Sequence, residues 1–248
     1  MTHTPRVAIV TGGLGGIGRA ICRQLAERGV QVVAADLAAD ADRLEAFATD
    51  MAGLPVTTLA VDVGEAAACA SAVAEVERRH GRLDILVNAA GITRDSTLRK
   101  MSTEQWDDVL RINLDSAFHL CRAAVDGMLA RGFGRIVNIS SVSGQTGNFG
   151  QTNYAAAKAG LHGLTMSLAR EVAAKGVTVN SLSPGYVETP MTAKMPPEVL
   201  ARTVASVPVG RVGQPDDIAR AVVFLTADDA GYITGINLPV NGGLLMGF

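Results

Sequence analysis

The sequence lacks an excess of charge of either sign, because 22 Lys and Arg residues stand against 24 Asp and Glu residues in a chain of 248. Nucleic-acid-binding surfaces usually come with an excess of positive charge, so no nucleic-acid partner is expected. No run of about 18 uninterrupted apolar residues occurs, so no membrane-spanning helix and no membrane partner are expected. The N-terminal segment also lacks the features of a secretory signal.

Cysteine is scarce, and histidine has no metal-ligand spacing. The three cysteines, Cys22, Cys69 and Cys121, are far apart and form no CxxC pair. An odd number of scattered cysteines fits a reducing compartment, so a cytoplasmic protein is expected. The four histidines are scattered too, so no metal site is expected.

Short β-branched runs alternate with longer Ala- and Leu-rich runs. The strand-like runs are mostly apolar throughout, which is typical of parallel strands buried on both faces. They span residues 7–11, 31–36, 56–61, 83–88, 135–140, 177–182 and 235–240. The helix-like runs span residues 16–28, 40–52, 65–80, 103–131, 153–175 and 215–227. This alternation predicts an α/β fold, a single doubly wound Rossmann domain with a mostly parallel seven-stranded sheet.

Several helix starts are visible in the sequence. Asp40, Ser102 and Thr152 are predicted N-caps, and Pro215 suits a first helical turn. The stretch 183–214 is rich in Pro and Gly and is predicted to be irregular. A connection of this length in a compact domain is more often functional than a boundary, so a substrate lid is expected at about 187–212. The whole chain, 1–248, is therefore predicted to be one domain.

A glycine-rich turn follows the first strand and opens a helix: Thr11-Gly-Gly-Leu-Gly-Gly-Ile-Gly18. A pyrophosphate needs free backbone N–H groups without an intervening Cβ, and it gains from the positive end of a helix. Gly12, Gly16 and Gly18 supply that geometry, together with Leu14 and Ile17 of the same turn. In this context the turn predicts dinucleotide binding.

Asp36 ends the second strand, 18 residues after Gly18. A carboxylate at this place can accept hydrogen bonds from ribose hydroxyls and repels a 2′-phosphate. NAD(H) is therefore the favoured cofactor. NADP(H) stays possible, because Arg19 and Arg43 are candidates to reach a phosphate.

The next two strand ends supply further candidates for the cofactor site. Asp62 and Val63 end the third strand, where a side chain can bond an adenine edge. Asn88 begins the Asn-Ala-Ala-Gly91 sequence that ends the fourth strand. Small residues there let a cofactor lie close to the sheet.

Tyr154 and Lys158 are spaced i, i+4 on a predicted helix and so share one face. A Tyr hydroxyl has an ordinary pKa near 10, which suits general acid–base work at neutral pH poorly. A lysine cation on the same face is expected to lower that pKa. Ser141 ends a strand 13 residues upstream and can bond the same substrate oxygen. Together the three side chains suit protonation of a carbonyl oxygen while hydride reaches the carbon.

These motifs, with Asn113 and Ser183-Pro184-Gly185, resemble the short-chain dehydrogenase/reductase family over nearly the whole chain. The resemblance implies that Tyr154 is the general acid/base, that Lys158 also binds ribose hydroxyls, that Ser141 orients the carbonyl and that Asn113 holds a relay water. It implies that the nicotinamide end lies against Pro184, Gly185, Val187 and Thr189. It also implies a homotetramer, with pairing through the helices at 103–131 and 153–175.

Residues 91–95, 144–154 and 175–180 are similar to the 3-oxoacyl thioester reductases of that family. The resemblance implies a small-molecule acyl-thioester substrate, with reduction of acetoacetyl-CoA to (R)-3-hydroxybutyryl-CoA as the expected reaction. The residues implied around the acyl part are Gln145, Asn148, Phe149, Gln151 and Tyr186. Two alternatives stay open: a carrier-protein thioester, and a simple ketone or secondary alcohol used with NAD. The candidates for docking a CoA phosphate or an acidic carrier are Arg131, Arg135, Arg170 and Lys175.

Overall fold

A single sheet of seven strands forms the centre of the computed structural model, which describes residues 4–189 and 197–246. The strands are β1 (Val7–Thr11), β2 (Gln31–Asp36), β3 (Val56–Ala60), β4 (Ile85–Asn88), β5 (Gly134–Ile139), β6 (Val177–Pro184) and β7 (Asn237–Val240). Their order is β3-β2-β1-β4-β5-β6-β7, and each pairing is parallel. The predicted α/β class and seven-stranded sheet are confirmed.

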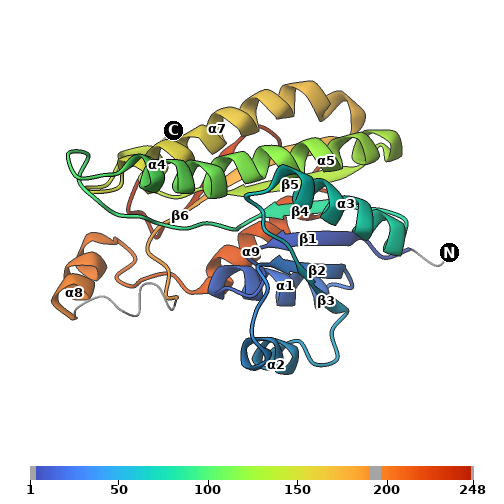
Figure 1. Ribbon diagram of the computed structural model, residues 1–248, viewed down its shortest axis with the longest axis horizontal. Coiled ribbons are helices and arrows are strands. Elements are labelled where there is room, and N and C mark those ends of the chain that lie inside the picture. The colour runs from blue at the N-terminus through green and yellow to red at the C-terminus, as the bar shows by residue number, and fades with distance from the viewer. Residues whose placement is uncertain (1–3, 190–196, 247–248) are drawn as a thin grey trace.

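Helices cover both faces of this sheet (Figure 1). They are α1 (Gly16–Ala26), α2 (Ala41–Asp50), α3 (Ala66–His80), α4 (Thr103–Leu110), α5 (Ser116–Arg131), α6 (Ser143–Thr146), α7 (Thr152–Val172), α8 (Pro197–Ser206) and α9 (Pro215–Thr226). Helices α1, α2 and α9 pack on one face, and α3, α5 and α7 on the other. Within the described ranges, no helix is long and apolar enough to cross a membrane.

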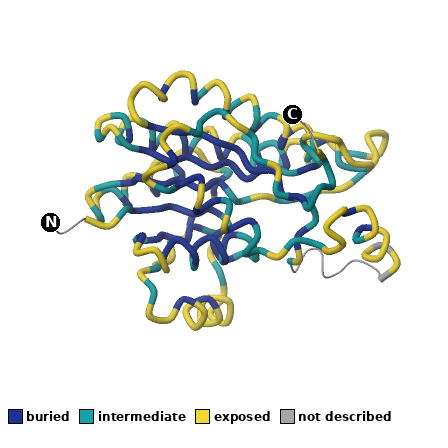
Figure 2. Tube along the Cα trace, turned by 180° about the vertical axis from the view of Figure 1, so that it is seen from behind, coloured by how far each residue is buried: buried dark blue, intermediate teal, exposed yellow. Residues whose placement is uncertain are grey.

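Side chains on the two faces of the sheet pack into two separate hydrophobic cores, which is why the strands are apolar at successive positions. In β1, Ala8 and Val10 join the core under α1 and α9, whereas Val7 and Ile9 join the core under α3 and α5. Successive strand side chains point to opposite faces, so a slip of one residue would exchange the two sets. Figure 2 shows the central strands as the buried layer of the molecule.

Two predicted N-caps are found and one is wrong. The Asp40 carboxylate accepts from the Arg43 amide at 2.8 Å, and Ser102 forms a capping box with Gln105. Thr152, by contrast, is the first residue of α7, and Gln151 holds the cap position. The Gln151 amide side chain is bonded elsewhere, to Asp95, so the helix start is fixed by tertiary contacts and not by a capping side chain.

Two other expectations need correction. The helix predicted over 103–131 is interrupted by a π-helical turn, Arg111–Asp115. The stretch 183–214 is not irregular throughout, because β6 runs on to Pro184 and α8 occupies Pro197–Ser206. Helix α8 was missed because the Pro and Gly residues of this stretch were interpreted as signs of irregular structure. Proline is in fact favourable at the first position of a helix, which is where Pro197 lies. Residues 190–196 of the expected lid lie outside the described residues.

The strand order indicates where on the sheet a ligand is expected to bind. The chain passes from β1 outward to β2 and β3, then returns to β4 on the other side of β1. In such sheets ligands bind at the carboxyl ends of the strands, where the order reverses. The loops after β1 and β4 approach closely there, because a Cβ on Gly12 would lie 3.0 Å from the Ala90 Cα atom.

Candidate active site

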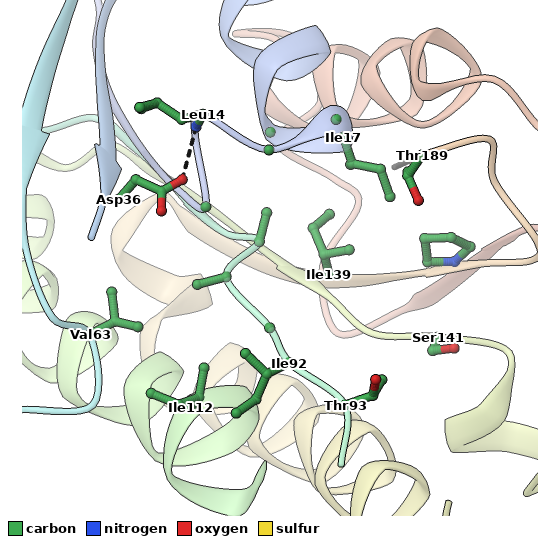
Figure 3. A pocket seen from close by; sticks show the side chains of 18 of the residues that line it. Leu14, Ile17, Asp36, Val63, Ile92, Thr93, Ile112, Ile139, Ser141 and Thr189 are labelled. Atoms are coloured by element: carbon green, nitrogen blue, oxygen red, sulfur yellow. Dashed lines mark hydrogen bonds between the residues drawn. The ribbon is translucent and has the colours of Figure 1, made fainter. Parts of the chain in front are cut away.

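A cavity of about 850 Å³ opens at the carboxyl ends of the strands. Figure 3 shows Leu14 and Asp36 at one end of it and Ser141 and Thr189 towards the other. The predicted site residues that line it are Gly12, Leu14, Gly16, Ile17, Gly18, Asp36, Asp62, Val63, Gly91, Ser141, Tyr154, Lys158, Pro184, Gly185, Tyr186, Val187 and Thr189. The structure thus brings together residues that come from six strand ends.

The glycine-rich turn leaves no room for side chains. A Cβ on Gly18 would lie 2.1 Å from the Gly12 carbonyl oxygen, and one on Gly13 would lie 2.8 Å from the Ala34 Cα atom. Gly12 has φ +64°, a backbone conformation that L side chains rarely adopt. Helix α1 begins directly after this turn, so its free N–H groups and positive end face the cavity. The cradle therefore fits a dinucleotide pyrophosphate.

Asp36 is bonded on both carboxylate oxygens. Its Oδ2 accepts from the Leu14 amide at 3.0 Å, as Figure 3 shows, and from the Arg43 guanidinium at 3.2 Å. Its Oδ1 accepts from the Leu37 amide at 2.9 Å. A carboxylate offers about four acceptor positions, so capacity for a ribose hydroxyl is left. The ion pair also places the Arg43 guanidinium on the cavity wall.

Ser141, Tyr154 and Lys158 meet at the other end of the cavity. The Ser141 and Tyr154 hydroxyls are hydrogen-bonded. The Lys158 ammonium donates to the Ile139 carbonyl oxygen at 2.8 Å and lies 5.6 Å from the Tyr154 ring centre. Gly144 allows α6 to approach α7 closely, since a Cβ there would lie 2.8 Å from the Lys158 carbonyl carbon. This approach brings the strand end that carries Ser141 to the helix face that carries Tyr154.

A lowered pKa was expected for Tyr154, but the net pKa of this phenol is raised. Burial raises the pKa of the Tyr154 phenol above its ordinary value, and the hydrogen bond with Ser141 only opposes this. Burial also lowers the pKa of Lys158 to about 8, so this group is still mostly a cation near pH 7. The site therefore holds Tyr154 as a neutral acid near pH 7, the form that a carbonyl reduction needs.

Asn113 lies in the π-helical turn and is 2% exposed. Its amide nitrogen donates to the Val109 and Ile92 carbonyl oxygens, both at 2.9 Å. Side-chain bonds to the backbone compete with regular helix bonds, which accounts for the irregular turn. Its Oδ1 atom is buried without a partner in the structure. A Cβ on Gly91 would lie 2.6 Å from this oxygen and 3.5 Å from the Lys158 ammonium, so both polar groups face one point.

We expect Asn113→Ala to lower kcat about 100-fold with little change in the KM for the dinucleotide, because a proton relay through Asn113 and Lys158 would lose its acceptor. Steady-state rates at saturating cofactor measure this. The matched control is Ser116→Ala, which removes the neighbouring bond to the Ile112 carbonyl oxygen, 2.7 Å long, without touching the cavity. Near-normal turnover of Asn113→Ala, or an equal loss in Ser116→Ala, would remove Asn113 from the relay.

Lys158 gives the free energy of unfolding a specific pH dependence. Its pKa is about 8 in the fold and about 10.4 in an unfolded chain. Between these values the unfolded chain holds the proton and the folded chain does not, so stability rises with pH through this window. From about pH 7 to about pH 10, urea denaturation should show the wild type gaining about 2–3 kcal/mol relative to Lys158→Met. Parallel pH profiles of the two proteins would contradict the depressed pKa.

Asn88 was expected at the cofactor, but the structure turns it into the interior. Its amide donates to Asn138 Oδ1 at 2.8 Å, and the Asn138 amide donates to the Thr165 hydroxyl at 2.9 Å. The backbone of Ala89 and Ala90, which follow it, lines the cavity instead. The link from β4 through β5 to α7 fixes the position of that backbone.

The expected acyl-contacting residues lie at different depths. Tyr186 lines the cavity, whereas Gln145 is exposed on α6, and Asn148 and Phe149 are exposed on the loop between α6 and α7. Gln151 is half-buried, and its amide is already bonded to Asp95 at 3.0 and 3.2 Å. These four residues belong to the rim of the site and not to its wall.

Sequence reasoning missed His162, which follows Lys158 by one helical turn. Its Nε2 lies 2.8 Å from the Ser140 hydroxyl oxygen and 3.3 Å from that of Ser183. Both hydroxyl hydrogens are committed elsewhere, to the Lys158 carbonyl oxygen and to Asn237 Oδ1. Nε2 is therefore the donor, and it ties the ends of β5 and β6 to α7. A single histidine without a ligand pattern gave no signal of this.

The apolar wall of the cavity was missed as well. Ile92, Ile112 and Ile139 face the cavity, as Figure 3 shows. Each lies next to or near a predicted site residue: Ile92 follows Gly91, Ile112 precedes Asn113, and Ile139 lies two positions before Ser141. The available signal was sequence proximity to a predicted site residue.

Two of the four candidate docking cations are engaged within the chain. Arg135 is buried and donates to four carbonyl oxygens, among them those of Ala227 and Asp228. Arg131 pairs with Glu77 at 3.1 Å. Lys175 precedes β6, at the edge of the sheet opposite to the cavity. The predicted docking role is therefore wrong for Arg135 and has no geometric support at Arg131 or Lys175.

Comparisons with known proteins agree with this geometry. A family model described as enoyl-(acyl carrier protein) reductase matches residues 12–245. The chain is 52% identical to an acetoacetyl-CoA reductase of Allochromatium vinosum, over 97% of this chain and 99% of the relative. It is 48% identical to an acetoacetyl-CoA reductase of Cupriavidus necator, over 98% and 100%. It is 45% identical to a 3-oxoacyl-(acyl-carrier-protein) reductase of Escherichia coli, over 99% and 100%.

Proposed function

We propose, because the chain belongs to the short-chain dehydrogenase/reductase family, that it reduces 3-oxoacyl thioesters, with acetoacetyl-CoA to (R)-3-hydroxybutyryl-CoA as its main reaction. The observation that carries this proposal is the meeting of Ser141, Tyr154 and Lys158 at a cavity whose other end is a glycine cradle. Relatives over nearly the full length are named for reduction of such thioesters.

The residues take the following parts in the proposal. A bound dihydronicotinamide supplies the hydride that reaches the ketone carbon. The Tyr154 hydroxyl donates its proton to the carbonyl oxygen, and Ser141 bonds the same oxygen. Lys158 and Asn113 return a proton to Tyr154 from solvent. One ketone, one hydride and one proton then give one alcohol.

NADH is the proposed coenzyme. The Asp36 carboxylate is fixed by two backbone amides at the end of β2, where it can bond ribose hydroxyls and repels a 2′-phosphate. Val63 and Asp62 would border the adenine, and Pro184, Gly185, Val187 and Thr189 the nicotinamide. NADPH stays the second choice because Arg43 is within reach of the same position.

A substrate panel with chiral analysis of the product tests the proposal. Acetoacetyl-CoA should be turned over faster than simple ketones of the same length, and the product should be the (R)-alcohol. Preference for a carrier-protein thioester with a salt-sensitive KM would favour the second candidate, since exposed docking charges are screened by salt. Faster turnover of simple ketones or secondary alcohols than of either thioester would overturn the assignment.

We also propose that the chain assembles as a homotetramer in the cytoplasm. Trp106, Phe118 and Met166 are exposed apolar side chains on α4, α5 and α7, and pairing through these helices would cover them. The three cysteines are free and buried, which fits a reducing compartment. Residues 1–248 would form one domain, with a lid at about 187–212 that is pinned at its ends by the bridge between Val187 and Gly213.

A further inference from the structure

Two loops at the rim of the cavity are joined to each other. The Ser96 amide donates to the Gly150 carbonyl oxygen at 2.9 Å. The Gln151 amide bonds Asp95, and the Asn153 amide donates to the Arg94 carbonyl oxygen at 3.2 Å. Asn153 is fully buried and immediately precedes Tyr154. The segment 94–101 is therefore held in a fixed position relative to the reacting end of the cavity.

The outer face of this rim is both apolar and cationic. Residues 97–101 form a turn closed by the amides of Lys100 and Met101, which donate to the Thr97 carbonyl oxygen at 2.8 and 2.9 Å. The turn exposes 69% of Leu98, and the joined loop exposes 88% of Phe149. Large apolar side chains this exposed, on two loops that are hydrogen-bonded to each other beside the residues of the cavity wall, indicate a binding surface.

Arg99 and Lys100 are exposed on the same turn. Neither has an ion pair in the described part of the chain, whereas Arg94 and Arg111 both lie within 4 Å of Asp108. Asp95, the nearest acidic residue in the segment, points to the Gln151 amide instead. Two exposed cations thus follow Leu98 on the same turn, on a segment that is hydrogen-bonded to the loop carrying Phe149.

We propose that this rim binds the CoA arm of the substrate, with Arg99 and Lys100 facing its phosphates and Leu98 and Phe149 packing against its pantetheine chain. The inference rests on the proposed function and assigns the carrier of the acyl group. A CoA thioester has groups that match these three features in order. It has a reacting acyl end, a pantetheine chain and several negatively charged phosphates. Guanidinium and ammonium groups are the usual partners of phosphates in proteins.

The test compares two thioesters that share the reacting end. Acetoacetyl-CoA carries phosphates, whereas acetoacetyl-N-acetylcysteamine does not. In the double variant Arg99→Ala/Lys100→Ala the KM for the CoA ester should rise about five- to tenfold, with kcat and the KM for the short thioester unchanged. In the wild type the KM for the CoA ester should rise with salt, and in the variant this dependence should shrink.

Matched controls separate a charge effect from a loss of fold. Arg28→Ala/Arg78→Ala removes two arginines that are exposed elsewhere, and it should leave both KM values unchanged. Arg99→Lys/Lys100→Arg should restore the wild-type KM, because it keeps both charges.

Three results would overturn the assignment of the rim. These are an unchanged KM for the CoA ester, an equal rise for both thioesters, and a rise confined to a carrier-protein thioester. The last result would give the cations to an acidic carrier. Absence of turnover of both thioesters by the wild type is a different outcome, because it would refute the proposed function itself.

Discussion

Replacement of Tyr154 by Phe is expected to lower kcat about 1,000-fold for thioester reduction, because the change removes only the hydroxyl that donates the proton. The phenol is held as an acid by burial, which raises its pKa. Steady-state rates over a range of acetoacetyl-CoA concentrations measure the effect.

The cofactor site should be unaffected by this change. Tyr154→Phe keeps the ring against α7, so NADH binding measured by fluorescence titration should stay within about twofold of the wild type. Ser141→Ala is the matched comparison. It removes a hydroxyl that orients the carbonyl but leaves the proton donor in place, so its loss should be smaller. A Tyr154→Phe variant that keeps more than about a tenth of the wild-type kcat would remove Tyr154 from the acid role.

Replacement of Asp36 by Asn is expected to raise the ratio of kcat/KM for NADPH to that for NADH about 10- to 100-fold. The side chain keeps its size and loses the negative charge that repels a 2′-phosphate. The change also releases Arg43, now paired with Asp36 at 3.2 Å, to face the phosphate. Initial rates with the two coenzymes, at a fixed thioester concentration, give the ratio.

A double variant shows whether Arg43 takes part in this change. If the freed guanidinium binds the 2′-phosphate, Asp36→Asn/Arg43→Ala should lose most of the gain for NADPH. Arg43→Ala alone should alter the NADH rate little. An unchanged coenzyme ratio in Asp36→Asn would count against Asp36 as the determinant of specificity, and an equal gain in the double variant would count against Arg43.

The sheet could be predicted because its signal is local and repeated. Runs such as Val7–Thr11 and Gln31–Asp36 are apolar at successive positions, and the structure has them with those bounds. The alternation of strands and helices predicted a doubly wound sheet, and the structure adds the order of its strands. The N-caps Asp40 and Ser102 could be predicted from residue type, because their short oxygen-bearing side chains can accept hydrogen bonds from the first-turn amides.

The features that were missed depend on contacts between distant segments. The π-helical turn arises because the Asn113 side chain bonds the Ile92 carbonyl oxygen, 21 residues away. The start of α7 at Thr152 follows from bonds between Gln151 and Asp95. Neither contact has a sequence pattern of its own. The sequence therefore indicated only a regular helix over 103–131 and a capping residue at Thr152.

The electrostatics of the site were also beyond the sequence. The i, i+4 spacing of Tyr154 and Lys158 indicated a shared helix face, but it did not indicate how deeply each group lies. Lys158 is 4% exposed, and its burial lowers its pKa to about 8, whereas burial raises the pKa of Tyr154. The same holds for Asn88, whose position at the end of β4 was predicted and whose amide is turned inward by its bond to Asn138.

The central claim is that this cavity reduces 3-oxoacyl thioesters with NADH. The most direct measurement is the initial rate of acetoacetyl-CoA reduction with NADH and with NADPH side by side, on the wild type and on Tyr154→Phe. We expect fast turnover by the wild type, a preference for NADH and a rate close to background for the variant. Fast turnover with NADPH preferred would contradict the coenzyme assignment, and no turnover with either coenzyme would contradict the proposed function.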